Sequence, residues 1–190
     1  MKLGIGLSPH DPEGVFEWAR RAEAGPYSTI GVLDRVVYLN PDALLTLAAL
    51  AGATSRVRLQ TEVLLAPLRN TTLLAKEVAT LDRLSGGRFV LGLGVGNYRG
   101  PYHDDYHAVS QDLHTRGRRL DEQVAEMRRL WAGEQIDEQT GPIGPLPSTP
   151  GGPRSCSAGS ARAPWSGWRA GARGSWPPVR PTTWATWSPR

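Results

Sequence analysis

Apolar residues in the first 135 positions follow two spacings that alternate along the chain. Short runs rich in branched aliphatic side chains predict strands at Lys2–Leu7, Thr29–Leu33, Val57–Pro67 and Arg88–Gly96. After each run, apolar residues recur every three or four positions, which predicts helices around Val15–Ala22, Asp42–Thr54, Leu74–Leu81 and Leu120–Trp131. The pattern therefore predicts four successive strand–helix units.

The ends of these helices carry their own signals. Asp11-Pro12 and Asn40-Pro41 each join a side chain that can cap a helix to a proline suited to the first turn. The apolar face of the first helix is expected to consist of Val15, Trp18, Ala19 and Ala22. Gly25-Pro26 then ends that helix.

The third run, Val57–Pro67, is nearly continuous in apolar residues, as expected for a strand buried on both faces of a parallel sheet. Four strand–helix units with right-handed crossovers fit an open doubly wound sheet or a (β/α)8 barrel. Residues 94–100 (GVGNYRG) superficially match a dinucleotide-binding fingerprint. That fingerprint needs a helix directly behind it, whereas Pro101 and a polar stretch follow, so we disfavour this reading.

Composition narrows the class of protein. No apolar run reaches 18 residues, so no membrane-spanning helix is expected, and Pro9 comes too early for a signal peptide. The single cysteine, Cys156, excludes an intrachain disulfide and a cysteine-based zinc cluster. These features predict a cytoplasmic protein.

The charge of the chain is divided unevenly. Residues 154–190 contain six of the 22 basic residues, all arginines, and no acidic residue. Residues 1–153 therefore contain the other 16 basic residues and all 18 acidic ones. Five of the seven tryptophans also lie in 154–190. We therefore expect three segments: a folded part at 1–135, a linker at 136–153, and an Arg/Trp/Pro-rich tail at 154–190 that is disordered or frameshifted.

Several pieces of the folded part, taken in order, resemble the N-terminal half of the luciferase-like flavin-dependent oxidoreductases. This family includes bacterial luciferase, alkanesulfonate monooxygenases and coenzyme F420-dependent reductases. The matching pieces are VLDR (32–35), LAALAGATSRVR (47–58), APLR (66–69), LAKE (74–77), TLDRLSGGR (80–88), LGLGVG (91–96) and RGRRLDE (116–122). The resemblance implies the first four βα units of a TIM (β/α)8 barrel, with a flavin at the carboxyl ends of the strands.

The resemblance also implies which residues contact the cofactor, FMN or alternatively F420. They lie at the ends of three strands: Asp34 and Arg35; Thr61, Glu62 and Val63; and Gly94, Gly96 and Asn97. The first pair would face the ring system, the second group would back the ring with a bulge and a strained Glu62–Val63 peptide, and the third would follow the ribityl chain. Glu62 replaces a glycine often found in F420 enzymes, which favours FMN.

Two of these assignments have structural alternatives. Asp34 and Arg35 could form an ion pair with each other in a surface loop. Gly92, Gly94 and Gly96 could relieve crowding in the barrel as readily as they could open access to a cofactor.

The polar stretch 98–107 holds two histidines and two aspartates, which raises the question of a metal site. Their spacing matches no standard zinc pattern and members of the resembled family need no metal, so we expect no metal here and a mobile substrate lid instead. His103 and His107 are weak candidates for a catalytic acid or base, as is His114, which could instead orient the helix that follows.

The tail departs from the family. A (β/α)8 barrel needs about 250 residues, yet no strand pattern follows Pro153. Read in a shifted frame, the codons of residues 154–176 can encode a strand, a Gly-Gly turn and a helix similar to the family, which suggests a frameshift near codon 153. Half a barrel would leave the first and fourth strands as open edges, so we expect flavin binding by this chain to be weak or absent.

Three functions remain in view. The first is a flavin-dependent monooxygenase or reductase that transfers hydride or oxygen to a small organic substrate, with a flavin reductase as partner if it uses FMN. An F420-dependent reductase is its variant, and neither requires nucleic acid or a membrane. The second is a non-catalytic half-barrel whose Arg/Trp tail binds nucleic acid or a membrane surface. The third is a half-barrel that completes its core as a homodimer.

Overall fold

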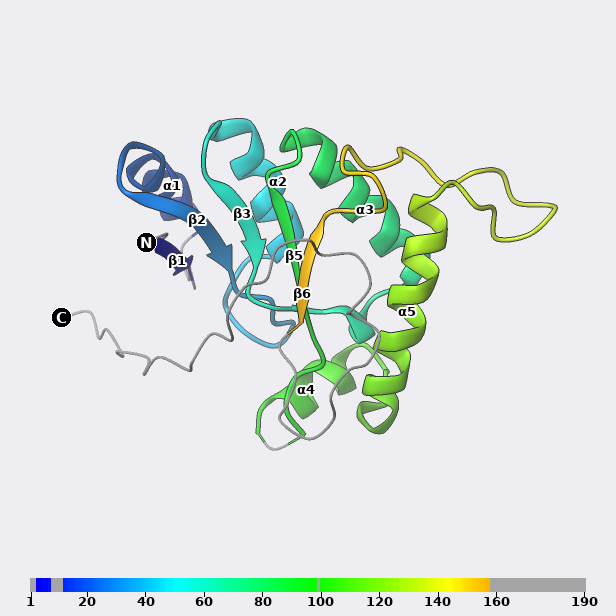
Figure 1. The fold of residues 1–190 in the computed structure, drawn as a ribbon. Helices are drawn as coiled ribbons and strands as arrows, with labels where there is room; N and C mark the ends of the chain where they lie inside the picture. Colours follow the sequence, from blue (N-terminus) through cyan, green and yellow to red (C-terminus); the bar gives the residue numbers. More distant parts are fainter. Residues whose placement is uncertain (1–2, 8–11, 99, 158–190) are drawn as a thin grey trace.

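The computed structural model describes residues 3–7, 12–98 and 100–157. Every strand pairing in this part of the chain is parallel (Figure 1). The order across the sheet is β1-β2-β3-β5-β4, and β6 pairs with β5. The strands are β1 (Leu3–Leu7), β2 (Tyr27–Val32), β3 (Arg58–Thr61), β4 (Leu64–Leu65), β5 (Phe89–Gly94) and β6 (Arg154–Ser157).

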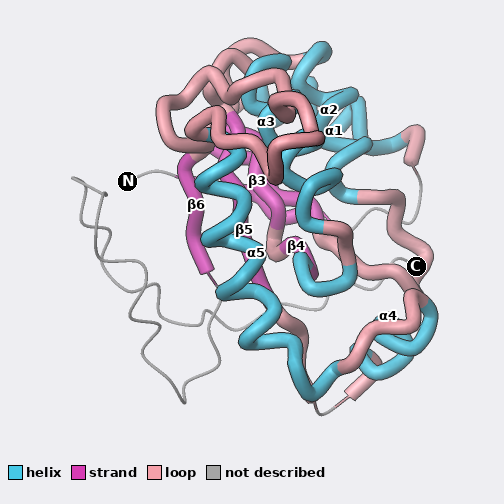
Figure 2. Tube along the Cα trace, turned by 90° about the vertical axis from the view of Figure 1, so that its right-hand side faces the viewer, coloured by secondary structure: helices cyan, strands magenta, loops and turns pink. Residues whose placement is uncertain are grey.

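Helices alternate with these strands; α1, α2, α3 and α5 lie along one side of the sheet, and α4 lies beyond its lower end (Figure 2). The α-helices are α1 (Gly14–Ala24), α2 (Ala43–Ala53), α3 (Thr71–Leu84), α4 (Tyr102–Ala108) and α5 (Arg116–Trp131). Short 3-10 helices, η1 (Ala66–Leu68) and η2 (Leu113–Thr115), precede α3 and α5. The predicted α/β class and its four strand–helix units are confirmed.

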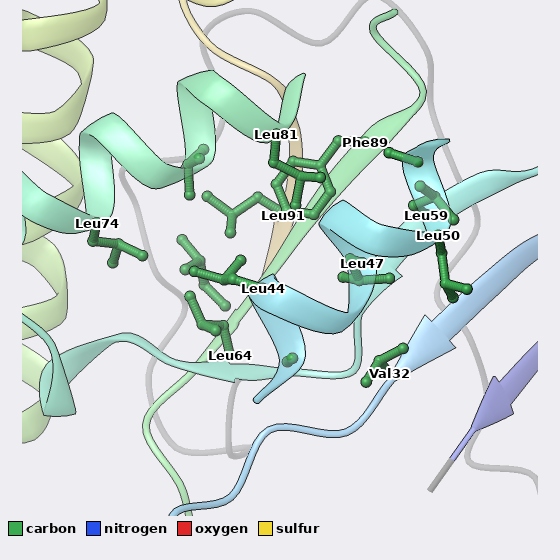
Figure 3. Packing of buried hydrophobic residues seen from close by; sticks show 14 of the residues in the cluster. Val32, Leu44, Leu47, Leu50, Leu59, Leu64, Leu74, Leu81, Phe89 and Leu91 are labelled. Carbon is green, nitrogen blue, oxygen red and sulfur yellow. The ribbon is translucent and has the colours of Figure 1, made fainter. Parts of the chain in front are cut away.

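The hydrophobic core lies between the helices and the sheet. Leu44, Leu47 and Leu50 of α2 pack over strand side chains that include Leu59 and Leu91 (Figure 3). Burial of each such leucine contributes about 2 kcal/mol relative to an exposed one. The four apolar residues that predicted the last helix are all buried in this core: Leu120, Val124, Met127 and Trp131.

Since core side chains alternate along each strand, the residues between them point to the opposite side of the sheet. We call this side, which no helix of the described chain covers, the inner face. Gly4, Gly6, Gly31, Gln60 and Gly92 occupy positions on it. Thr29, Arg58, Val90 and Arg154 occupy the same face nearer the amino ends of the strands, so only its carboxyl part consists largely of glycine backbone.

The strand predicted over Val57–Pro67 is interrupted. β3 ends at Thr61, Glu62 and Val63 form a bulge with a cis peptide bond between them, and β4 resumes at Leu64. The hydrophobic run continues across the break because both halves are buried. Apolar patterning reports burial and does not show where the backbone changes direction.

The structure differs from the predictions for the first two helices in two details. Trp18 is 50% exposed, with the Arg21 guanidinium 5.8 Å from its ring, so the buried face of α1 consists only of Val15, Ala19 and Ala22. The α2 cap is not Asn40 but Asp42, which accepts a hydrogen bond from the Leu45 N–H at 2.9 Å. Asp11, the predicted cap of the first helix, lies outside the described residues.

The segment predicted as a linker, 136–153, contains no helix or strand and is held against α3. Thr149 donates to Asp82 through its N–H at 2.8 Å, and Lys76 Nζ donates to the Gly144 carbonyl at 2.6 Å. These contacts place Arg154–Ser157 beside β5, where they form β6.

The strand β6 corrects two expectations. A strand was not expected after Pro153, and β5 was expected to be an open edge. A strand can form without apolar periodicity when a neighbouring strand offers free backbone groups for pairing. The rest of the predicted tail, 158–190, lies outside the described residues. No helix within the described part of the chain is both long and apolar enough to cross a membrane.

Glu23 provides a test of how α1 is joined to β3. Its half-buried carboxylate accepts hydrogen bonds from the N–H groups of Ser55, Arg56 and Val57 at 2.9, 2.6 and 3.0 Å. Burial opposes ionisation, but these donors lower the pKa of Glu23 to about 2. Because the pKa is lower in the folded state, this stabilisation is complete above the unfolded pKa of 4.5 and disappears as pH falls towards 2.

We expect Glu23→Gln to reduce the free energy of unfolding at pH 7 by about 1 kcal/mol, since the group is partly exposed. Urea unfolding at a series of pH values measures the effect, which should shrink as pH falls below 4.5. The exposed Glu138→Gln is the control. A loss that stays constant with pH would contradict this account.

Candidate functional site

The carboxyl ends of the parallel strands meet at one edge of the sheet, and the bulge after β3 lies at this edge. Thr61 fixes the start of the bulge, because its hydroxyl donates to the Gly92 carbonyl at 2.7 Å and accepts from the Gly92 N–H at 2.8 Å. The N–H of Glu62 donates to the Val32 carbonyl at 2.8 Å. The bulge is therefore hydrogen-bonded to the strands on both of its sides.

The glycines of β5 accommodate this bulge. A Cβ at Gly92 would lie 2.1 Å from the Thr61 carbonyl oxygen, and one at Gly94 would lie 2.4 Å from Cγ2 of Val63. Gly96, with φ of +68°, would place a Cβ 2.9 Å from the Tyr102 ring. Close packing against neighbouring residues is thus one reason for a glycine at each of the three positions.

The side chain of Glu62 extends from the bulge across β2 and β1. A Cβ at Gly31 would lie 2.0 Å from its Cδ, and a Cβ at Gly6 would lie 2.4 Å from its Oε2. Gly6 and Gly31 are paired in register, so together they leave the space that the carboxyl group fills. Burial raises the pKa of Glu62.

Asp34 lies behind the bulge, on the side of the helices. It is 4% exposed, and its two oxygens accept from the Leu65 N–H at 2.8 Å and from Arg69 Nη2 at 2.9 Å. Burial raises the pKa of Asp34, whereas the positive charge of Arg69 lowers it. Arg69 also pairs with Asp42, the cap of α2, at 2.9 Å. Asp34 therefore joins the end of β2 to β4 and to the start of α2.

Arg35 turns away from Asp34, so the two do not form the surface ion pair that we considered. Its guanidinium donates to Asp105 and to the Pro101 carbonyl and lies 4.5 Å from the centre of the Tyr102 ring. Asp105 is fully buried and also accepts from the N–H groups of Val36 and Val37 at 2.9 and 2.7 Å. One carboxylate thus holds α4 against the loop that follows β2.

The stretch that predicted a mobile lid contains this helix. Besides Asp105, Tyr106 anchors it, being 2% exposed with its hydroxyl donating to the Val95 carbonyl at 2.9 Å. Burial raises the pKa of Tyr106 to about 12. The described part of 98–107 therefore includes a helix that is fastened to the carboxyl edge at two buried residues.

The histidine candidates lie on the exposed side of this region. His103, whose Nε2 is 3.0 Å from the Tyr98 carbonyl, is exposed, as are His107 and His114. Asp105 is buried, and its carboxylate forms an ion pair with Arg35. No three His, Cys, Asp or Glu side chains are grouped as metal ligands anywhere in the described ranges.

The structure thus brings Thr61, Glu62, Val63 and Gly94 together, places Asp34 behind them and directs Arg35 to α4. Gly96 packs on Tyr102, and Asn97 beyond it is exposed.

Sequence reasoning missed two groups of residues. Gly6 and Gly31 receive Glu62, and a signal was available, because each glycine interrupts a strand between two apolar residues. Arg69 and Asp105 carried no local signal, since their partners lie 35 and 70 positions away.

A profile of the family described as luciferase-like monooxygenase matches residues 3–173. A putative coenzyme F420-dependent oxidoreductase of Mycobacterium tuberculosis is 33% identical over 155 residues, which cover 78% of this chain and 42% of that protein. The oxygenase component of the flavin-dependent trigonelline monooxygenase of Acinetobacter baylyi is 33% identical over 116 residues, covering 60% and 31%.

Among solved structures, monooxygenase RslO1 from Streptomyces bottropensis superimposes with a TM-score of 0.73 at 26% identity, covering 83% of this chain and 53% of that one. Such neighbours are TIM-barrel enzymes, so of the two architectures considered, the barrel is the one that the described sheet belongs to. The chain spans about half the length of this structure and less than half that of the two relatives.

The attachment of α4 can be tested at Asp105. Asp105→Asn replaces one carboxylate oxygen by an NH2 group, which cannot accept a hydrogen bond. Either Arg35 or the two loop N–H groups therefore lose their acceptor. We expect a loss of about 3 kcal/mol in the free energy of unfolding, together with faster proteolysis within 98–112. Asp104→Asn, on the exposed side of the same helix, is the matched control. Equal stability and proteolysis of the two variants would show that the carboxylate does not hold α4.

Proposed function

Because this chain belongs to the luciferase-like monooxygenase family, we propose that it forms the flavin-binding edge of a flavin-dependent oxidoreductase. The observation that carries the proposal is the hydrogen-bonded bulge Thr61–Val63 at the carboxyl edge of a parallel sheet, beside the carboxyl part of the inner face, which consists largely of glycine. Barrels of this kind place their sites at that edge. The activity, substrate and partner of the whole protein are part of the proposal.

The residues at this edge suit a flat, largely apolar ring. Gly6 and Gly31 add no side chains of their own to the inner face of β1 and β2, so the Glu62 side chain lies flat against the backbone there. The bulge offers a peptide surface and the Val63 side chain, and neither can shift easily because Gly92 and Gly94 pack closely behind them. Ligand sites combine such apolar walls with a few fixed polar groups.

The residues of the protein bind the flavin, orient it and shield it from water. We assign Thr61, Glu62 and Val63 to backing the ring, and Gly94, Gly96 and Asn97 to its ribityl side. Arg35 and α4 restrict the approach of water from the loop after β2. When bound, a flavin supplies the hydride or oxygen chemistry, which no side chain of these residues can provide.

We assign FMN as the cofactor, with a small organic substrate and a partner reductase that delivers reduced flavin. The resemblance to the oxygenase component of a flavin-dependent monooxygenase supports this assignment. Glu62, which stands where F420 enzymes often have glycine, supports it as well.

F420 is the second candidate. The observation in its favour is the putative coenzyme F420-dependent oxidoreductase, whose similarity extends over 78% of this chain. A direct comparison of the two cofactors separates the candidates.

Titration of the full 190-residue chain with FMN and with F420, followed by flavin fluorescence, tests the proposal. We expect saturable binding, weak but tighter for FMN. Gly94→Ala should weaken FMN binding at least tenfold, about 1.4 kcal/mol, because its methyl group would collide with Val63 and displace the bulge. Gly52→Ala on α2, which has no neighbour within 4 Å, is the matched control.

Tighter binding of F420 would select the second candidate. Absence of saturable binding for both cofactors, or equal affinity of the two glycine variants for FMN, would contradict the site.

A further inference from the structure

Glu62, which is partly buried, differs from three buried carboxylates that each have a partner. Asp105 is met by Arg35, Asp34 by Arg69, and Asp82 by Thr149. Within the described residues, the carboxyl oxygens of Glu62 have no hydrogen bond and no ion pair, and burial is what raises the pKa of the group. A carboxylate in this position loses part of its hydration without receiving a donor from the described residues in exchange.

Packing alone does not require a carboxyl group here. A glutamine has the same shape and a leucine a similar volume, and neither would carry the desolvation penalty of an ionised group. The structure nevertheless reserves space for this side chain at Gly6 and Gly31, where any other residue would meet it within 2.4 Å or less.

Within the described residues, no positively charged side chain forms an ion pair with Glu62. β1 and β2 face it with Gly6 and Gly31, which have no side chains, whereas Gly92 of β5 lies against Thr61. Across Gly92, β6 contributes Cys156, whose thiol has its pKa raised by burial and by the negative charge of Glu62. Arg58 and Arg154 occupy inner-face positions nearer the opposite end of the sheet.

We propose that Glu62 selects the substrate of this site, and that the selected class is small organic molecules carrying a positively charged nitrogen. The inference rests on the proposed function, since it names the substrate of the same edge. A cation above Gly6 and Gly31 provides the partner that the described residues do not supply. Charge-assisted hydrogen bonds of this kind are about twice as strong as neutral ones.

The dependence on pH follows from the position of Glu62. Bound cation favours the ionised carboxyl, so the affinity for a cation increases as pH rises through the elevated pKa of free Glu62. Affinity for a neutral molecule of the same shape does not increase. Cys156 of β6, a titratable group near Glu62, stays uncharged over the lower part of this range because its own pKa is also raised.

Calorimetric titration of the full chain with benzylammonium and with benzyl alcohol, between about pH 4 and pH 8, tests the inference. We expect benzylammonium to bind at least tenfold tighter at the upper pH and to lose this advantage at the lower. Glu62→Gln should abolish the preference. Glu77→Gln, the same change on the exposed side of α3, is the matched control.

A second variant keeps the carboxylate but removes it from its place. Gly31→Ala puts a methyl group where the Glu62 carboxyl lies, and the flexible side chain can move away without unfolding the sheet. We expect this variant to lose the preference for the cation as Glu62→Gln does. A preference retained in either variant would overturn the inference.

Repeating the titrations with FMN separates the possible outcomes. FMN binding without any preference for the cation overturns the inference and leaves the proposed function standing. A Glu62-dependent preference for the cation without FMN binding supports the inference and overturns the proposed function. If Glu62→Gln weakens FMN as much as benzylammonium and the two ligands compete, the carboxylate serves an N–H of the flavin, and the assignment to substrate is overturned.

Discussion

The hydrogen bonds around the break between β3 and β4 determine how the carboxyl edge of this protein is built. Thr61 is bonded twice to Gly92, and the N–H of Glu62 is bonded to Val32. These bonds satisfy the N–H of Glu62 and both backbone groups of Gly92 where the chain leaves the plane of the sheet, and a buried segment needs such partners. The bulge, the close approach of β5 and the direction of the Glu62 side chain all follow from this arrangement.

A second set of polar contacts holds the loops around that edge. Asp34 and Arg69 connect β2, β4 and the start of α2, and Asp105 fastens α4 to the loop after β2. Buried ionic groups are costly unless each is paired and hydrogen-bonded, and these groups are. Apolar packing stabilises the layer of helices, whereas charged groups position the edge. A ligand site at this edge therefore has walls of fixed shape.

The carboxyl part of the inner face consists largely of glycine, so few side chains cover the backbone there. Glycine in a strand weakens it, because it adds conformational entropy to the unfolded chain and contributes no packing. This loss of stability applies at Gly6, Gly31 and Gly92. In exchange, Glu62 lies against the backbone of the first two and Thr61 against the third. The Glu62 carboxylate has a large effect on which ligands this surface favours, because few other charges of the described residues are near enough to oppose it.

The sequence by itself determined the alternation of strands and helices, the parallel sheet and the buried face of α5, because these depend on the spacing of apolar residues within one segment. It also identified Thr61 to Val63 as a special point, through a family resemblance. Only the tertiary structure decided that Asp34 pairs with Arg69, that Trp18 is exposed and that Arg154–Ser157 join the sheet. Each of these outcomes depends on groups brought together from distant parts of the chain, and local spacing carries no record of which groups those are.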